Sequence, residues 1–224
     1  MSPRLALLSV LPTLAALALT VSAAAAADDC FLSDDLSDLK GVARIAGDGK
    51  AAFGATPDKA GACVGKCAYV LPGDVVAFGA ARGAATCAAF TGAGGRQTFG
   101  WLPTDRLGPY APAIADWAGY WGDKDRYVSI KVDGGDLAIE AKMTYQGAGP
   151  VFSGAFHGKA VPVGGIVTLA NDAKGRQVDP AKAPAEACRA KLVLAGGALL
   201  VHDEGCVGAG SAANFDGAYT RLKN

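Results

Sequence analysis

Hydrophobic and polar residues alternate strictly along residues 127–133, where valine or isoleucine occupies every second position. Strict alternation predicts a half-buried β-strand, because successive side chains of a strand point to opposite faces. Gly134 and Gly135 follow, and two glycines at this place predict a tight hairpin turn, since glycine accepts positive φ. Folding about this turn sets Ile130 opposite Ile139, so apolar residues meet on one face of the predicted hairpin.

A second hairpin is predicted about Gly196-Gly197, where Leu192 lies opposite Val201. Elsewhere the apolar segments are short, rich in β-branched and aromatic residues, and separated by glycine, of which the chain has 31. Nothing after residue 27 shows a sustained helical period of apolar positions. The pattern therefore predicts an all-β protein.

The first 27 residues differ from the rest. Arg4 supplies a short basic start, residues 5–21 are almost entirely leucine, alanine and valine, and three alanines end at Ala27. A basic start, an apolar stretch and a small-residue exit are typical of a cleaved secretory signal peptide. A retained membrane anchor is the alternative, but Pro12 interrupts an already short apolar run. We expect cleavage after Ala27 and a periplasmic or secreted protein.

Without residues 1–27 the chain has 197 residues, with 20 basic and 21 acidic side chains. Such a balance lacks the clustered basic face expected of a nucleic-acid-binding protein. No later apolar run approaches the ~20 residues of a membrane-spanning helix. We therefore expect no nucleic-acid partner and no integral membrane association after signal cleavage.

The six cysteines all follow the predicted cleavage point, and an even number in an exported chain predicts three disulfides. In the second hairpin Cys188 lies opposite Gly205, so a one-residue bulge there would bring it to Cys206. The other four cysteines can pair in three ways, and we favour one of them. A zinc site is the competing interpretation, but no second closely spaced pair supports it. The favoured bonds are Cys63–Cys67 and Cys30–Cys87.

Two prolines among small residues make residues 109–116 typical of a linker. We expect it to join two β-modules, residues 28–108 and residues 117–224, each with its own core.

The first module carries two short motifs, the turn Gly73-Asp74 followed by valines and the pair Gly100-Trp101 at the start of a late strand. With these motifs, residues 64–108 resemble bacterial SH3-like domains. The resemblance implies a small barrel that Trp101 fills. It also implies binding of peptides or cell-wall material, which family members commonly perform through aromatic grooves.

The second module opens with Gly119-x-Trp121 and ends near Arg221. It looks like the C-terminal half of uncharacterised secreted proteobacterial proteins that pair an SH3-like module with an antiparallel β-domain. Its two end motifs are also similar to those of calycin barrels, in which an arginine packs over a tryptophan. That likeness implies an antiparallel sheet or partial barrel whose first and last strands meet through a cation–π contact between Trp121 and Arg221.

Candidate chemistry is sparse. His157 and His202 are the only histidines, and the hairpin register places His202 on the face opposite to Leu192, so we interpret it as a solvated or edge residue. No Gly-x-Ser-x-Gly motif supports a hydrolytic triad. We predict no catalytic residue, no metal site and no cofactor, and hence that the chain is not an enzyme.

Four aromatic residues in and after the SH3-like module are the candidate ligand-binding residues. Aromatic side chains suit peptide or glycan recognition, and they suit the core of a small barrel equally well. We favour a core position for Trp101 and leave Tyr69 and Tyr110 open. The four are Tyr69, Phe99, Trp101 and Tyr110.

These observations favour an exported, non-enzymatic binding module for a peptide, a peptidoglycan fragment or a protein partner, with a lysozyme-inhibitor-like role as one version. The alternative is a small calycin-like carrier of an apolar ligand, and a hydrolase comes third. A binding module should show an exposed aromatic groove and a carrier an apolar cavity. An enzyme should show a pocket with a perturbed titratable residue.

Overall fold

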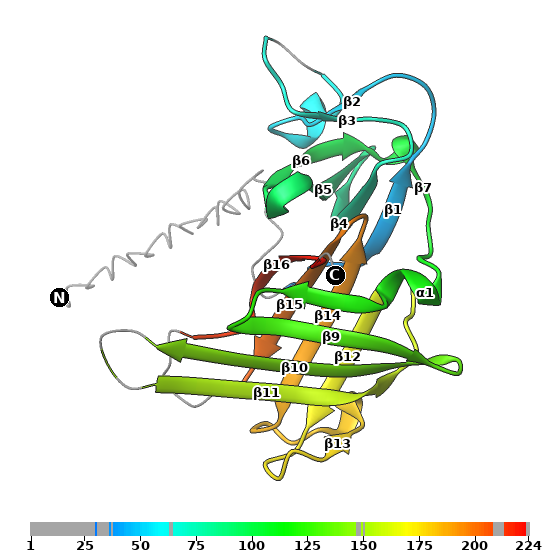
Figure 1. Ribbon diagram of the computed structural model, residues 1–224. Helices are drawn as coiled ribbons and strands as arrows, with labels where there is room; N and C mark the ends of the chain where they lie inside the picture. Colours follow the sequence, from blue (N-terminus) through cyan, green and yellow to red (C-terminus); the bar gives the residue numbers. More distant parts are fainter. Residues whose placement is uncertain are drawn as a thin grey trace, which may run out of the picture.

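The computed structural model describes residues 30, 36, 38–62, 65–146, 149, 151–207 and 213–222. The all-β class is confirmed, because antiparallel strands make up most of this part of the chain and its one α-helix, α1 (Ile114–Trp117), has four residues (Figure 1). Four single 3-10 turns complete it: η1 (Pro57–Lys59), η2 (Ala93–Gly95), η3 (Thr104–Arg106) and η4 (Pro180–Lys182). No helix in the described ranges is long and apolar enough to cross a membrane.

The N-terminal strands form an open five-stranded sheet and a separate two-stranded ribbon. In spatial order the sheet consists of β6 (Gln97–Pro103), β5 (Ala85–Thr91), β4 (Val75–Arg82), β1 (Gly41–Ile45) and β7 (Leu107–Pro109). The ribbon consists of β2 (Ala51–Ala52) and β3 (Tyr69–Val70).

The small barrel expected for this module is not closed in the described strands, which form an open sheet. Strands β6 and β7 are the two ends of the sheet, and no ladder joins them in the described ranges. Strand β7 has only three residues and ends at Pro109, and the segment that follows β2 meets β6 through one isolated bridge, between Gly54 and Trp101. These segments are too short to continue the ladder around a barrel.

The C-terminal strands form two sheets. In spatial order the first consists of β11 (Val151–Ala160), β10 (Asp136–Gln146), β9 (Arg126–Asp133) and β8 (Gly119–Gly122). The second consists of β13 (Gln177–Val178), β12 (Ile166–Asn171), β14 (Cys188–Ala195), β15 (Ala198–Glu204) and β16 (Gly217–Thr220). In Figure 1 the strands of the first sheet cross in front of those of the second.

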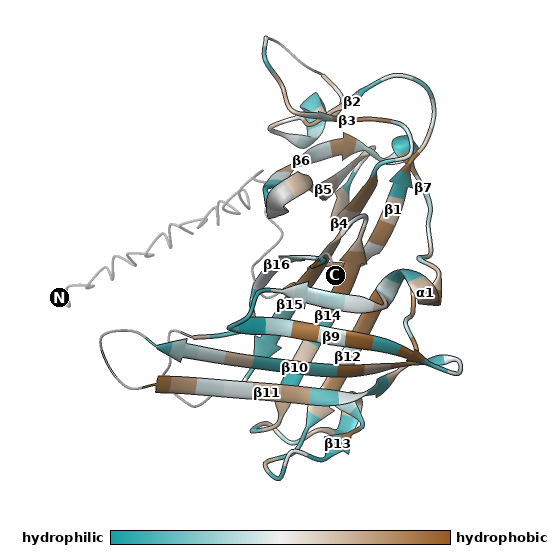
Figure 2. Ribbon diagram, viewed as in Figure 1, coloured by the Kyte–Doolittle hydropathy of each residue, from teal (hydrophilic) through white to brown (hydrophobic). Residues whose placement is uncertain are grey.

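Both predicted hairpins are confirmed in the predicted register. Ile130 pairs with Ile139 across the β9–β10 turn, and Leu192 pairs with Val201 across the β14–β15 turn. Gly134 turns the first hairpin with a φ of 67°, a conformation that side chains with a Cβ rarely adopt. Figure 2 shows the resulting alternation of hydrophobic and hydrophilic residues along β9 and β10.

Apolar side chains fill the space between the two C-terminal sheets. Trp117 and Trp121 are at most 1% exposed, and the rings of Phe156 and Phe215 meet edge to face at 4.9 Å. These residues belong to one cluster that draws on both sheets.

The expectation of two separate cores is wrong, and the module boundaries at residues 108 and 117 stay a prediction. Val193 and Leu200 lie on the outer face of the β14–β15 hairpin and belong to one cluster with Val42, Val75 and Ala77 of the N-terminal sheet. Residues 192–195 and 198–201 form continuous apolar runs, and such runs are typical of strands buried on both faces. This hairpin therefore joins the two cores.

Two disulfides confirm two of the predicted pairings. Cys30 is bonded to Cys87 on β5, and Cys188 is bonded to Cys206. Cys63 lies outside the described residues, so the predicted Cys63–Cys67 bond stays a prediction.

The first and last strands of the C-terminal module meet as predicted. The guanidinium carbon of Arg221 lies 4.6 Å from the centre of the Trp121 ring, and these two residues form an antiparallel bridge. The side chain of Arg221 runs over Gly119, where a Cβ would lie 3.2 Å from its Cδ, and donates a hydrogen bond to the carbonyl of Asp116. The predicted cation–π contact is confirmed, although one bridge does not close a barrel.

Replacing Arg221 with alanine is expected to lower the free energy of unfolding by about 1–2 kcal/mol, because the cation–π contact and the side-chain packing over Trp121 are both lost. Replacement with lysine should recover part of this, since lysine keeps the charge without the planar stack. Urea unfolding measures both. Lys124→Ala is the control, because that side chain is 90% exposed. A midpoint for Arg221→Ala equal to that of the control would contradict the prediction.

Candidate functional site

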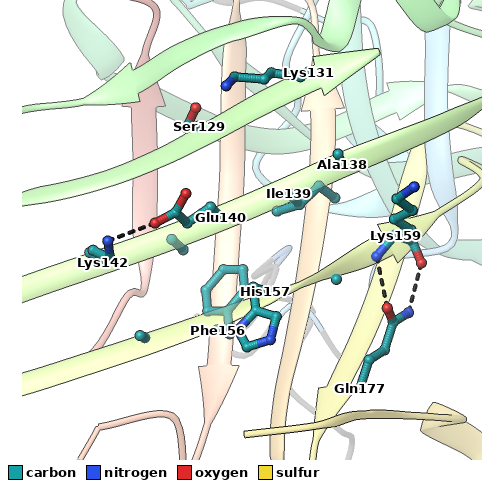
Figure 3. Close-up of a pocket in the computed structure, with 13 residues that line it drawn as sticks. Ser129, Lys131, Ala138, Ile139, Glu140, Lys142, Phe156, His157, Lys159 and Gln177 are labelled. Atoms are coloured by element: carbon teal, nitrogen blue, oxygen red, sulfur yellow. Dashed lines mark hydrogen bonds and ion pairs between the residues drawn. The ribbon is translucent and has the colours of Figure 1, made fainter. Parts of the chain in front are cut away.

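A hollow of about 580 Å³ lies on the outer face of β9, β10 and β11. We call it the β10 groove, because β10 runs along its middle (Figure 3). Its floor is formed mainly by small residues, and polar or charged side chains surround them. The residues that carry the argument below are Ser129, Lys131, Ala138, Glu140, Lys142, Ala155, His157 and Lys159.

The strand alternation produces the groove. Every second residue of β10, such as Ile139, points inward and is buried, which leaves Ala138, Glu140 and Lys142 on the outer face. In the observed register Ala138 pairs with Lys131 of β9 on one side and with Lys159 of β11 on the other. A methyl group thus lies between two lysines. Small side chains in the centre and long ones beside them make this face concave.

The next positions along the groove are also set by the register. Glu140 lies between Ser129 and His157, and Lys142 lies opposite Ala155. The outer face therefore presents cationic, then anionic, then cationic groups along β10.

Two ion pairs organise these charges. Lys142 Nζ lies 2.7 Å from Glu140 Oε1, and Lys159 Nζ lies 2.6 Å from Asp133 Oδ2. The hydrogen bond from Lys142 lowers the pKa of Glu140, and the bond from Lys159 lowers the pKa of Asp133. Both carboxyl groups are therefore ionised near neutral pH.

Lys131 differs from the other two lysines. In the described ranges no side chain forms an ion pair or hydrogen bond with its ammonium group, although its charge also helps to lower the pKa of Glu140. Its charge is therefore available to a ligand.

Two side-chain amides from the second sheet hold β11 in place. The amide of Asn171, which is 3% exposed, accepts from the His157 N–H at 3.0 Å and donates to the His157 carbonyl at 2.9 Å. The amide of Gln177 forms the same pair of bonds with the backbone of Lys159, at 2.8 and 2.7 Å (Figure 3). Each amide replaces a neighbouring strand, so the backbone below the groove is held on both edges.

The four aromatic residues predicted to bind a ligand do not lie together. Trp101 is 2% exposed and packs in the shared core, as we favoured from the sequence. Phe99 lines one hollow, beside Phe53, and Tyr110 lines another. Tyr69 is 46% exposed and lies under Lys50, whose ammonium is 4.0 Å from the ring centre. The β10 groove has a charged lining in place of the aromatic one that we expected.

The interpretation of His202 as a solvated residue is wrong. Its side chain is 14% exposed, its Nδ1 lies 2.9 Å from Asp216 Oδ1, and its Nε2 is buried without a hydrogen-bond partner in the described part of the chain. On the same face its cross-strand neighbour Lys191 donates to the carbonyl of Leu36, so Leu36 lies beside this face. In the described ranges no hydroxyl group is bonded to this histidine, and no group of histidine, cysteine and carboxylate side chains could hold a metal ion.

Comparison with known proteins adds no relative: no protein-family model, no curated protein and no solved structure matches the chain. The SH3-like and calycin-like resemblances stay predictions that rest on the sequence motifs alone.

No sequence pattern marked the β10 groove as a binding surface. Part of the groove could be located from the sequence, since the register of the first hairpin already placed Ser129 and Lys131 on its polar face. The partner strand β11 reads as glycine-, alanine- and lysine-containing sequence with little alternation, so its register could not be assigned.

Proposed function

We propose that this protein is an exported, non-enzymatic binding module for a peptide, a cell-wall fragment or a protein partner, and that the β10 groove is its contact surface. Export is supported by the signal-like first 27 residues and by two disulfides, which form and persist in oxidising compartments.

The observation that carries the proposal is the groove itself. It has the volume of a typical ligand site, about 580 Å³, and lies on a β-sheet and not on loops. Its backbone is fixed by the β9–β10–β11 ladders and by two bidentate amides, so its lysines project from a preorganised surface.

The charges of the groove suit binding better than catalysis. A general acid or base works best with a pKa near the working pH. The pKa values of Glu140 and Asp133 are instead lowered by their lysine partners, so both are fully ionised acceptors. Residues of this kind hold a ligand through charge and do not exchange protons near neutral pH.

The carrier alternative requires an apolar cavity between the two C-terminal sheets. Trp121, Phe156 and Phe215 fill that space and are at most 1% exposed.

Replacing Ala138 with tryptophan is expected to fill the groove and to weaken binding at least tenfold. Tryptophan is well tolerated in strands, so the sheet should persist. The matched control is Thr144→Trp, which lies on the same face of β10 but does not line the groove. Binding is measured by co-sedimentation with insoluble peptidoglycan and by fluorescence anisotropy with labelled peptides. If neither probe binds the parent protein, or if both variants bind like the parent, the proposal fails.

A further inference from the structure

Two lysines flank the small residue Ala138 across the groove. Lys131 and Lys159 lie on strands two apart, so their backbones are separated by roughly 10 Å across the methyl group of Ala138. Lysine side chains are long and flexible, so both ammonium groups can approach an anion that sits over the alanine.

Three lysines and the carboxylates near them set the charge of the groove. Lys131, Lys142 and Lys159 line it together with a single carboxylate, Glu140, and Asp133 and Asp136 lie at its rim. Glu140 forms an ion pair with Lys142, and Asp133 forms one with Lys159. In the described ranges Lys131 has no ion-pair partner of its own, so its ammonium group can meet an anion in the groove.

The existing ion pairs can yield to a ligand. The side chains of Lys142, Glu140, Lys159 and Asp133 are each between 56% and 60% exposed. Exposed pairs of this kind contribute little to stability, so a ligand carboxylate can share or replace the partner of either lysine at low cost.

The central carboxylate restricts what kind of anion fits. Glu140 lies between the cationic position at Ala138 and the cationic position at Lys142, so a polymer with uniform negative charge would place one of its charges against this carboxylate. A chain with spaced carboxylates avoids the repulsion, and a hydrogen-bond donor between them would pair with Glu140.

An extended peptide has the matching spacing. Alternate side chains of a strand project from the same face about 6.6–6.8 Å apart, which is also the spacing of Ala138, Glu140 and Lys142 along β10. The backbone of β10 is paired on both sides, so recognition here uses side chains and not addition of a strand.

We propose that the β10 groove binds an extended acidic peptide that carries carboxylates at positions i and i+4 and a hydrogen-bond donor at i+2. One carboxylate lies over Ala138 between Lys131 and Lys159, the donor meets Glu140, and the second carboxylate meets Lys142. This inference rests on the proposed function, because it assigns a ligand to the same groove.

The test uses fluorescence anisotropy with two labelled peptides of equal length. One has glutamate at i and i+4 with glutamine at i+2, and the other has glutamine at all three positions. The parent protein should bind the acidic peptide at least tenfold more tightly, and salt should weaken this binding. Lys131→Gln should lose about tenfold in affinity for the acidic peptide. Lys131→Arg should keep most of it, and the exposed control Lys124→Gln should bind like the parent.

Equal binding of the two peptides, or an unchanged affinity in Lys131→Gln, would overturn the inference. If peptidoglycan binds the parent and Ala138→Trp abolishes that binding while the acidic peptide does not bind, the proposed function stands and the peptide assignment is wrong. If neither peptide nor peptidoglycan binds, both are wrong.

Discussion

Replacing both Cys30 and Cys87 with alanine is expected to lower the free energy of unfolding by about 4 kcal/mol. The two cysteines are separated by 57 residues in the sequence, so their bond closes a long loop in the unfolded chain and removes much of its conformational entropy. The bond also ties Cys30 to β5 beside the shared core, where Cys87 is 4% exposed.

The second described disulfide is the internal comparison. Cys188 and Cys206 are separated by 18 residues, so the double alanine variant of this pair should lose about 3 kcal/mol. Urea unfolding of both variants, with the parent protein as reference, gives the two losses. If the variant without the Cys188–Cys206 bond loses more stability than the variant without the Cys30–Cys87 bond, loop entropy does not account for the stabilisation.

Replacing Asp203 with alanine is expected to lower the free energy of unfolding by about 3 kcal/mol at neutral pH. The carboxylate is 8% exposed and accepts hydrogen bonds from the N–H groups of Phe215, at 2.5 Å, and of Cys206, at 3.1 Å. Its loss leaves both buried backbone donors without an acceptor, and a buried unpaired donor is costly. Asp105→Ala, at an exposed carboxylate, should change stability by less than about 0.5 kcal/mol.

The effect of Asp203 should depend on pH with a definite sign. Burial is the main cause that raises the pKa of this carboxyl group above its ordinary value. The folded protein therefore holds the proton more tightly than the unfolded chain does. The proton therefore adds to the stabilisation by Asp203: this added part is fully present below about pH 3.9 and is lost as pH rises through the raised pKa, which leaves the hydrogen-bond contribution at neutral pH. Urea titrations of parent and Asp203→Ala at several pH values measure it. A stability difference that grows with pH in this window would contradict the sign.

Local patterns in the sequence determined more of the C-terminal module than of the N-terminal one. The alternation about Gly134-Gly135 and Gly196-Gly197 specified two registers, because a shift by one residue would turn every apolar side chain to the wrong face. The same reasoning paired Cys188 with Cys206, and the contact between Trp121 and Arg221 followed from a family likeness.

The N-terminal module was predicted less well because its strands lack such patterns. Strand β5 has three alanines among its seven residues and is buried along most of its length, so its sequence does not distinguish an inner face from an outer one. The pairing of β4 with β5 also shifts register between Phe78 and Ala81, so a simple alternation of side chains does not predict it. Motif likeness alone suggested a barrel, whereas the described strands form an open sheet.

The sequence by itself determined the all-β class, two hairpin registers, the Cys188–Cys206 bond and the contact between Trp121 and Arg221, since each depends on local alternation or a short motif. The tertiary structure alone decided that the β14–β15 hairpin packs against the N-terminal sheet, that His202 is covered, and that Lys131 and Lys159 flank Ala138. Each of these features depends on strands that no short turn connects, or on a face that another element covers. Pairing between distant segments depends on the packing of the whole chain, which local side-chain patterns do not specify.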